Sequence, residues 1–375
     1  MRVGVNLLWL VPGDVGGSEE YITRQLTALR SHCPDIALTL FVVEGFVAAH
    51  PGLAASCDVV VAPITGSRRL VRVVAERVWL PRASRRSRVD VMHHAGGTMP
   101  AGGRVPSVVT VHDAQYLTFP ETFRPIKLRW LRRSVPAAVR RASVVAVPSR
   151  FVAESLTAAY RLDIDRTIVV PNAFVPDPTA TTEPEVLRKR YDLGSPVLVY
   201  PAITYRHKNH AMLLRAFNRV LTELPGACLV LIGGVGPCEA EVRATAMSLG
   251  VWDHVRRPGR VPDADRDGLV GMADALVFPS RYEGFGVPVV EAMALGCPVI
   301  AANATALPEA VGDAGILVDP DDVDGWVEAI NLVVRDPGVA ADLRRRGAVR
   351  LASLSPAQSA RALESAYRLA YCPTS

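Results

Sequence analysis

The segment that decides the fold is PSRYEGFGVPVVEAMALGCP, which spans residues 279–298. An apolar run of strand length precedes it, Pro288 suits the first turn of a helix, and Gly296 suits the position just after one. The segment therefore predicts a strand, a glycine-bearing loop and a helix. Glu283 then lies on the loop, and Glu291 lies close to the first turn of the helix.

Loop glycines let the backbone approach a ligand closely, and the free amides at a helix start attract phosphate. Carboxylates beside a phosphate site make sense as hydrogen-bond acceptors for hydroxyl groups, one on a sugar and one on a ribose. The structural alternative is that Glu283 is a solvated loop acid and that Glu291 complements the helix dipole. The whole segment favours ligand binding, because motif context carries more weight than either residue alone.

Outward from this segment, both halves of the chain alternate short apolar runs with helical patterns. The strands predicted in the first half are Val3–Leu8, Ala37–Val42, Val59–Val61, Val108–Val111 and Val144–Val147. Those predicted in the second half are Val197–Tyr200, Cys228–Ile232, Ala275–Phe278, Pro298–Ala301 and Gly315–Val318. Continuously apolar strands separated by helices indicate parallel sheets covered on both faces. The predicted fold class is α/β, with two doubly wound, Rossmann-like domains facing a central cleft.

Prolines mark the boundary between the halves, since four prolines within fourteen residues cannot continue a helix or an interior strand. We predict a first domain over residues 1–172, joined by a C-terminal helix at about 355–375. The predicted linker covers residues 173–184, and the second domain covers residues 185–354.

The composition is that of a globular protein, with 49% hydrophobic and 21% charged residues in a chain of 375. No long apolar run and no signal-peptide pattern occurs, so we expect neither a transmembrane helix nor an export signal. The six cysteines show no Cys-x-x-Cys spacing, which favours reduced thiols over a disulfide framework or a zinc site. The predicted location is cytoplasmic.

Positive charge is concentrated in the first half. Residues 1–180 carry 22 Lys and Arg against 14 Asp and Glu, whereas residues 181–375 carry 20 against 23. This asymmetry predicts that the first half meets something anionic, for which nucleic acid, an anionic membrane surface or a phosphorylated acceptor would each fit.

Residues 279–298 resemble the Glu-x7-Glu signature of the retaining family-four glycosyltransferases, which have the two-domain GT-B fold. The likeness continues through residues 301–309 and 315–320, and it covers the second half closely and the first half more loosely. It implies transfer of a hexose-type sugar from a nucleoside-diphosphate sugar to a glycan, lipid-linked or small-molecule acceptor. The first domain would bind the acceptor and the second domain the donor.

Residue by residue, the resemblance implies that Glu283 is catalytic and contacts the hydroxyls of the donor sugar. Glu291 would contact the nucleotide ribose. The other donor-binding residues that the resemblance implies on this segment are Gly284, Phe285, Gly286 and Val287.

A second segment, YPAITYRHKNH at residues 200–210, is similar to the family's diphosphate-binding loop. Lys208 is one of three lysines beside 39 arginines, which indicates a need for a compact point charge; a plain surface lysine is the alternative. The resemblance makes Lys208 catalytic. Many family members place an arginine six residues earlier, where this chain has Ala202. Arg206 is therefore included among the donor contacts as a replacement, a role that the sequence leaves open.

Two segments of the first half have weaker signals. GDVGGSEE at residues 13–20 resembles the family's glycine-rich loop, which makes Gly16 and Gly17 predicted donor contacts, although it is not a dinucleotide fingerprint. TVHD at residues 110–113 ends a strand, and the resemblance makes His112 a catalytic residue near the donor sugar. The residues alone favour a structural histidine.

No carboxylate in the first half has the context of a covalent nucleophile. The resemblance implies that the leaving diphosphate assists the incoming hydroxyl on the same face, while Lys208 and a helix N-terminus stabilise its charge. Because these groups neutralise the diphosphate, and because no Asp-x-Asp ends a strand, we expect no metal and no cofactor beside the nucleotide-sugar substrate. Asp163 and Asp165 lie in a polar connection instead.

Other functions stay open. The same fold could serve a sugar-nucleotide epimerase or a phosphorylase. A non-catalytic binder would be expected to lose one of Glu283, Lys208 and His112, and all three are present. The arginine run over residues 68–88 raises nucleic-acid binding, but Trp79 is its single aromatic residue and no recognition motif matches, so no nucleic-acid partner is predicted.

The same arginine run, with further cations over residues 124–133, surrounds Trp79, Leu80, Trp130 and Leu131. Basic stretches with exposed aromatic residues can sit at an anionic membrane face, which predicts peripheral contact with the inner membrane face and a lipid-linked or otherwise anionic acceptor. An evenly weighted alternative is a solvated helix face with the tryptophans in the core.

Overall fold

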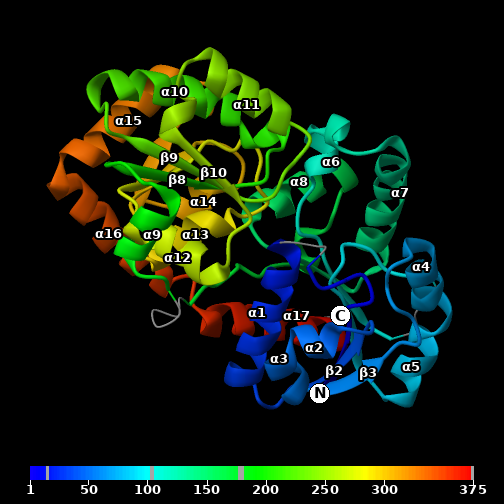
Figure 1. Ribbon diagram of the computed structural model, residues 1–375. Helices are drawn as coiled ribbons and strands as arrows, with labels where there is room; N and C mark the ends of the chain where they lie inside the picture. The colour runs from blue at the N-terminus through cyan, green and yellow to red at the C-terminus, as the bar shows by residue number, and fades with distance from the viewer. Residues whose placement is uncertain (14–16, 102–104, 176–180, 373–375) are drawn as a thin grey trace. The chain divides into compact units, whose positions relative to one another are not determined.

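The computed structural model describes residues 1–13, 17–101, 105–175 and 181–372. The chain forms two compact units: the first takes Met1–Ala173 and Leu354–Ser375, and the second takes Phe174–Ser353. Each unit has its own parallel sheet with helices on both faces (Figure 1).

Within the described residues, the sheet of the first unit has the strand order β3-β2-β1-β4-β5-β6-β7. Its strands are β1 (Arg2–Asn6), β2 (Ala37–Val42), β3 (Asp58–Val61), β4 (Val91–His94), β5 (Ser107–Thr110), β6 (Val144–Val147) and β7 (Thr167–Val169). Its α-helices are α1 (Gly17–His32), α2 (Phe46–Ala49), α3 (Pro51–Ala55), α4 (Arg69–Val78), α5 (Leu80–Arg86), α6 (Gln115–Thr118), α7 (Pro125–Arg141), α8 (Arg150–Tyr160) and α17 (Pro356–Tyr371). Short 3-10 turns are η1 (Pro120–Thr122) and η2 (Ile164–Arg166).

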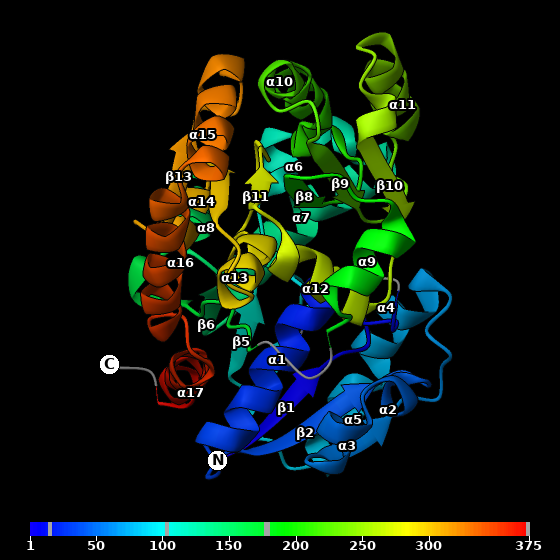
Figure 2. The ribbon, with the colours of Figure 1, turned by 60° about the vertical axis from the view of Figure 1, so that its left-hand side comes forward.

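Alternate residues of the central strands face opposite layers of this unit. Val108 and Val144 pack in the core formed with α1 and α17, whereas Val109 and Val145 pack in the core formed with α7 and α8. The period of two is that of a strand buried on both faces, which is why these runs are continuously apolar. The C-terminal helix α17 thus completes the first unit, where it lies beside α1 (Figure 2).

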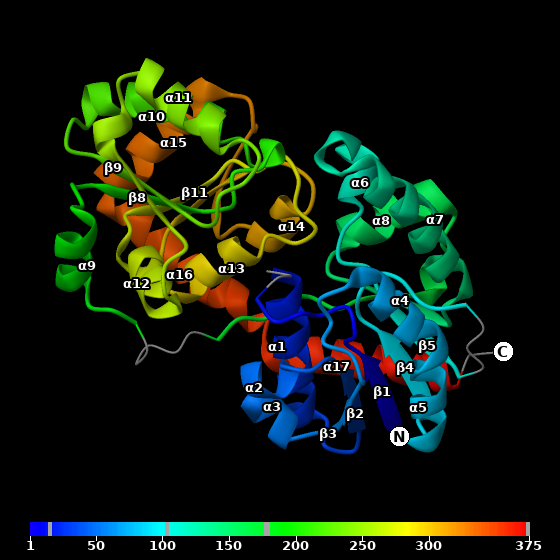
Figure 3. The same ribbon diagram turned by 45° about the vertical axis from the view of Figure 1, so that its right-hand side comes forward.

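The sheet of the second unit has the order β10-β9-β8-β11-β12-β13 in the described residues. Its strands are β8 (Val197–Pro201), β9 (Cys228–Ile232), β10 (Val255–Gly259), β11 (Ala275–Phe278), β12 (Val299–Ala302) and β13 (Gly315–Val318). Its α-helices are α9 (Pro184–Tyr191), α10 (His210–Glu223), α11 (Glu239–Ser248), α12 (Asp263–Met272), α13 (Val287–Ala294), α14 (Leu307–Val311), α15 (Val323–Arg335) and α16 (Pro337–Ala352), with 3-10 turns η4 (Arg206–Lys208) and η5 (Trp252–His254). Figure 3 shows α10, α11 and α15 on one face of the sheet and α12 and α13 on the other.

Both sheets reverse their strand order in the middle. In the first unit β1 pairs with β2 on one side and β4 on the other, and in the second unit β8 pairs with β9 and β11. Such a switch point leaves a crevice beyond the carboxyl ends of the two strands, and open parallel sheets bind their ligands there. We therefore expect a ligand site of the second unit to lie at the loops after β8 and β11.

The predicted fold class is confirmed, because each unit is an all-parallel sheet between helices. Three strands were missed: β4 ends in two histidines, β7 is short and follows a polar turn, and β10 contains two arginines and a proline. All three depart from the apolar runs that predict buried strands. Pro184, assigned to the linker, instead begins α9, a position that suits its fixed φ.

Candidate active site

The switch point of the second sheet brings together the two residues of the second half that were predicted to be catalytic. Lys208 follows β8 and Glu283 follows β11, and these two strands are paired neighbours. Because the carboxyl ends of paired parallel strands lie together, residues 75 positions apart in the chain meet. Nζ of Lys208 lies 2.5 Å from Oε1 of Glu283, and the two side chains are 18% and 14% exposed.

Buried neighbours hold both partners of this ion pair in place. The hydroxyl of Tyr200 donates to the carbonyl of Lys208 at 2.6 Å, and Nζ of Lys208 lies 5.6 Å from the ring centroid of Phe278. Burial and the charge of Glu283 raise the pKa of Tyr200, so its hydroxyl stays a donor. The amide of Glu283 donates to Oγ1 of Thr305 at 3.0 Å. These contacts fix the backbone on which each charge is mounted.

The loop that carries Glu283 ends at the N-terminus of α13. Gly286 has φ +100°, and a Cβ at this position would lie 2.7 Å from Cδ2 of Leu307, so the turn requires glycine. No side chain caps α13 at this residue. The positive end of the helix dipole therefore faces the same loop as the ion pair, which suits an anionic ligand. Gly284, Phe285 and Val287 lie on this turn with Gly286.

Glu291 lies one turn further along α13, in an environment that the sequence did not predict. Burial lowers the pKa of Arg266 on α12, but Asp267, Glu291 and Asp263 together raise it above its usual value. Glu291 thus lies within electrostatic reach of a guanidinium from a neighbouring helix. No spacing in the sequence links residues 266 and 291, since only the packing of α12 and α13 brings them near each other.

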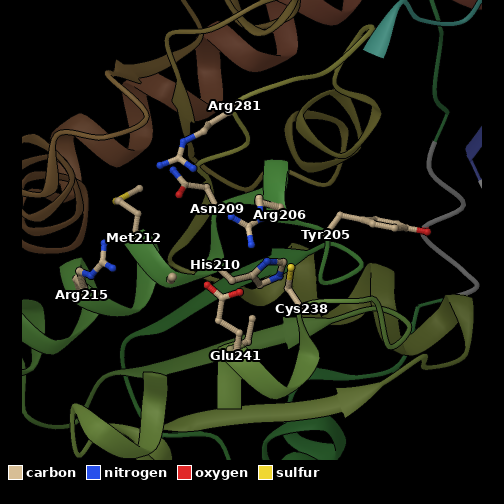
Figure 4. Close-up of a pocket in the computed structure, with 11 residues that line it drawn as sticks. Tyr205, Arg206, Asn209, His210, Met212, Arg215, Cys238, Glu241 and Arg281 are labelled. Carbon is tan, nitrogen blue, oxygen red and sulfur yellow. The ribbon is translucent and has the colours of Figure 1, made fainter. Parts of the chain in front are cut away.

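Arg206, which we included among the donor contacts in place of the missing arginine, lines a cavity of about 180 Å³. We call it the α10 cavity. Its polar lining includes Arg206, Asn209, His210, Arg215, Glu241 and Arg281 (Figure 4). Lys208 and Glu283 are not among its lining residues. Ala202 itself is buried, and its carbonyl oxygen lies 2.7 Å from where a Cβ of Gly233 would be.

Sequence reasoning also missed a polar network beside the loop that follows β8. The amide of Gly236 donates to Oγ1 of Thr204 at 2.8 Å, and that hydroxyl donates to Oε2 of Glu239 at 2.8 Å. Nη2 of Arg257 binds the same carboxylate oxygen at 2.9 Å, and its Nη1 donates to the carbonyl of Gly233 at 2.6 Å. The network ties the loops after β8 and β9 together. Its members come from separate elements, so no local motif could reveal it.

In the first unit, His112 lies just beyond the end of β5. Its Nε2 donates to the carbonyl of Ala95 at 2.7 Å, so Nδ1 carries the lone pair. Burial lowers the pKa of His112, and the bond to Ala95 and the charge of Asp113 oppose this shift only in part. His112 also lines a cavity of about 270 Å³ together with Gly97, Asp113 and Lys127. A neutral imidazole therefore lines a polar cavity in this unit.

Two further histidines at the end of β4 were missed by sequence reasoning. His93 bonds the hydroxyls of Tyr367 at 2.9 Å and Thr110 at 2.7 Å, and burial lowers its pKa to about 3. His94 lies 3.3 Å from Nδ2 of Asn6, and burial lowers its pKa to about 4. Adjacent histidines closing an otherwise apolar run are the signal that could have indicated this polar cluster.

The glycine-rich loop of the first unit is described only in part. Gly16 lies outside the described residues, whereas Gly17 is the first residue of α1. Next to it, Oε2 of Glu19 accepts the amide of Gly13 at 3.0 Å, and Oε1 lies 2.8 Å from Nε2 of His50. The described flanks of the loop are thus held to each other by one carboxylate.

The basic stretch of the first unit differs from the expected exposed aromatic surface. Leu80 is buried, and the rings of Trp79 and Phe41 form a T-shaped pair at 6.1 Å between centroids. Leu80 and Trp79 therefore pack toward the core. The exposed apolar residues are aliphatic instead: Leu70 on α4 is 82% exposed and Ile126 on α7 is 87% exposed. No helix in the described ranges is long and apolar enough to cross a membrane.

Comparison with known proteins agrees with this architecture. The family model described as "Glycosyltransferase Family 4" matches residues 15–177, and the model described as "Glycosyl transferases group 1" matches residues 185–350. A solved structure of sucrose-phosphate synthase from Thermosynechococcus elongatus superposes with a TM-score of 0.77 over the full length of both chains, at 19% identity. At that identity the match shows the fold alone.

Among curated relatives, O-antigen chain mannosyltransferase B of Escherichia coli is 31% identical over 222 residues, which are 58% of this chain and 58% of the relative. A GDP-mannose-dependent alpha-(1-6)-phosphatidylinositol monomannoside mannosyltransferase of Mycolicibacterium smegmatis is 32% identical over 53% of this chain and 55% of the relative. The chain thus spans little more than half the length of these relatives. Two family models match consecutive parts of the chain, the Glu-x7-Glu loop lies at the switch point of the second sheet, and the fold matches. This protein therefore belongs to the family-four glycosyltransferases.

Proposed function

We propose that this chain is a retaining, metal-independent glycosyltransferase that moves a hexose from a nucleoside diphosphate to a hydroxyl acceptor. The observation that carries this proposal is the pair of Lys208 and Glu283 beside the N-terminus of α13. A lysine, a carboxylate and an uncapped helix start match the three needs of the donor: a cation and amides for the diphosphate, and an acceptor for the sugar hydroxyls.

In the proposed reaction, the bond from the anomeric carbon to the diphosphate oxygen breaks while a bond to the acceptor oxygen forms on the same face. The acceptor proton passes to an oxygen of the leaving diphosphate. Lys208 and the amides at the start of α13 stabilise the negative charge that grows on this leaving group. Glu283 orients the sugar through its hydroxyls, and Glu291 does the same for the ribose. No residue of the chain forms a covalent intermediate.

The proposed donor to test first is GDP-mannose. Both curated relatives described above are mannosyltransferases by name, and the mycobacterial one is named as dependent on GDP-mannose. Retention and donor choice are tested together by incubating the chain with GDP-mannose, GDP-fucose, UDP-glucose or UDP-galactose and following the slow transfer of sugar to water by proton NMR.

We expect GDP-mannose to be consumed fastest, with α-mannose as the anomer formed first. A β anomer formed first would overturn the retaining mechanism, and a requirement for inorganic phosphate would point to a phosphorylase instead. Glu283→Gln keeps the size of the side chain but weakens its acceptor capacity, so it should slow the reaction with every donor that the chain uses.

For the acceptor, we propose the cavity beside His112. The neutral imidazole of His112 presents an Nδ1 lone pair to which an acceptor hydroxyl could donate, and Lys127 on the same lining would favour an anionic acceptor. The charge of Arg69 and burial both lower the pKa of Lys127, with burial the larger cause. A lipid-linked or otherwise phosphorylated glycan acceptor meets both requirements.

A peripheral contact with an anionic membrane is the second part of the proposal. Leu70, Val74 and Val78 are 82%, 59% and 50% exposed, and they lie four residues apart on one side of α4. Arginines flank this apolar stripe, as is typical of a helix that lies in a membrane interface.

Flotation with liposomes tests this contact: binding should require anionic lipid and fall as salt rises. Leu70→Glu should release the chain from vesicles, whereas Met247→Glu, at an exposed apolar position of α11 in the other unit, should not. Equal recovery with neutral and anionic vesicles would contradict the proposal.

A further inference from the structure

The α10 cavity has features of a binding site, although the proposed transfer reaction does not use it. It lies at the N-terminus of α10, a helix of 14 residues whose N-cap residue, Asn209, makes no side-chain capping bond. Its volume of about 180 Å³ is roughly that of six water molecules, enough for a small polar metabolite. Figure 4 shows that its polar side chains come from η4, α10, α11 and the loop after β11.

Cations dominate the lining of the cavity. Three guanidinium groups, from Arg206, Arg215 and Arg281, face one carboxylate, Glu241. Arg281 is already engaged, since its Nε donates to Oδ1 of Asp321 at 3.1 Å. Within the described part of the chain, Arg206 and Arg215 form no ion pair. Unpaired guanidinium groups beside a helix N-terminus are suited to a phosphate, which they can bind through several N–H groups at once.

A buried histidine packs behind the wall of the cavity. His210 is 3% exposed, and its ring packs on Tyr200 at 4.8 Å between centroids. Neither ring nitrogen has a hydrogen-bond partner among the described residues, and both are closed off from the cavity. Burial and the charges of Arg257 and Lys208 lower the pKa of His210 to about 3, so the ring is neutral and adds no charge beside the arginines.

We propose that the α10 cavity binds the phosphate group of a small hydroxylated phosphomonoester, such as a sugar phosphate, at a site separate from Lys208 and Glu283. Arg206, Arg215 and the N-terminus of α10 bind the phosphate oxygens. Glu241 accepts a hydroxyl of the ligand. This site is additional to the proposed donor site.

The test is isothermal titration calorimetry of the full chain with inorganic phosphate, glucose 6-phosphate and glucose in a phosphate-free buffer of low salt. Both phosphate compounds should bind, glucose 6-phosphate the more tightly, and glucose should show no binding. Arg215→Gln should weaken the binding of glucose 6-phosphate by about tenfold or more. An unchanged melting temperature would verify that the variant is folded.

Two controls separate this cavity from other sources of anion binding. Arg219→Gln removes a cation one turn further along α10, where Arg219 pairs with Asp324 outside the cavity, and it should leave the affinity within about twofold. Lys208→Met should also leave it unchanged, since a phosphate bound as a mimic of the donor diphosphate would depend on Lys208. Binding that is lost in Lys208→Met and kept in Arg215→Gln overturns the proposal, and so does the absence of phosphate binding.

Discussion

At the carboxyl edge of the second sheet, Lys208 and Glu283 form an ion pair, whereas at the edge of the first sheet burial holds His93, His94 and His112 neutral. The strands behind both edges are parallel. What differs is the polar groups at the strand ends: one edge carries an ion pair beside a helix start, and the other carries three neutral imidazoles.

This difference matches the chemistry of the proposed reaction. A leaving diphosphate carries the charge, so the side that binds it needs a fixed cation and oriented amides. An acceptor hydroxyl is neutral, so the side that receives it needs hydrogen-bond partners that do not compete for the diphosphate. The comparison therefore assigns the charged and uncharged parts of the reaction to different units of the chain.

The largest expected effect is that of Lys208→Met, which removes the cation from the charged edge. Because the lysine would stabilise the leaving diphosphate, kcat/KM for the donor should fall by about 10²–10³-fold, or about 3–4 kcal/mol. Steady-state release of nucleoside diphosphate measures this. Lys189→Met on α9 removes an exposed lysine from the same unit and should leave the rate unchanged. A similar rate for both variants would show that the ion pair is structural.

Glu291→Ala should have the next largest effect, because the proposed ribose contact is lost. Affinity should fall by about 1–3 kcal/mol for the donor and for the free nucleoside diphosphate alike, since both contain the ribose. Calorimetric titration with each ligand measures the change, with Glu328→Ala on α15 as an exposed control. Unchanged affinity for the diphosphate would remove Glu291 from the site.

The neutral edge predicts a pH effect on stability. Above about pH 6.5 His93 is neutral in both the folded and the unfolded chain; below it, the unfolded chain binds a proton that the folded chain does not bind until its pKa of about 3. The free energy of unfolding should therefore decrease as the pH falls through this window, by about 1.4 kcal/mol per pH unit for this residue.

Urea unfolding of the chain and of His93→Gln at pH 6 and pH 5 measures the pH dependence directly. The variant lacks the titrating group, so its stability should depend less steeply on pH by about that amount. The same slope in both proteins would mean that His93 is not held neutral in the folded state.

The smallest expected effect is that of a chelator. If Lys208 and the start of α13 neutralise the diphosphate, saturating EDTA should leave the rate of donor consumption unchanged. In the described part of the chain no group of three or more His, Cys, Asp or Glu side chains is placed to hold a metal ion. Loss of activity with EDTA and its return with manganese or magnesium would assign the charge stabilisation to a metal.

The sequence by itself predicted the α/β class, ten of the strands and the strand–loop–helix unit that carries Glu283. These features depend on local pattern: apolar runs predict buried strands, and a proline followed by a glycine at helical spacing brackets α13. The same local logic failed for β4 and β10, whose histidines and arginines are satisfied by partners far along the chain, such as Tyr367 for His93 and Asp192 for Arg256.

Only the tertiary structure decided which polar groups meet. The pairing of β8 with β11 places Lys208 against Glu283, and the packing of α12 near α13 places Arg266 near Glu291. It also placed Arg206 in the lining of the α10 cavity, which does not include Lys208 or Glu283. The physical reason is that a strand or helix is specified by neighbours a few residues apart, whereas a site is specified by the order in which whole strands pair, and that order depends on the packing of the entire core.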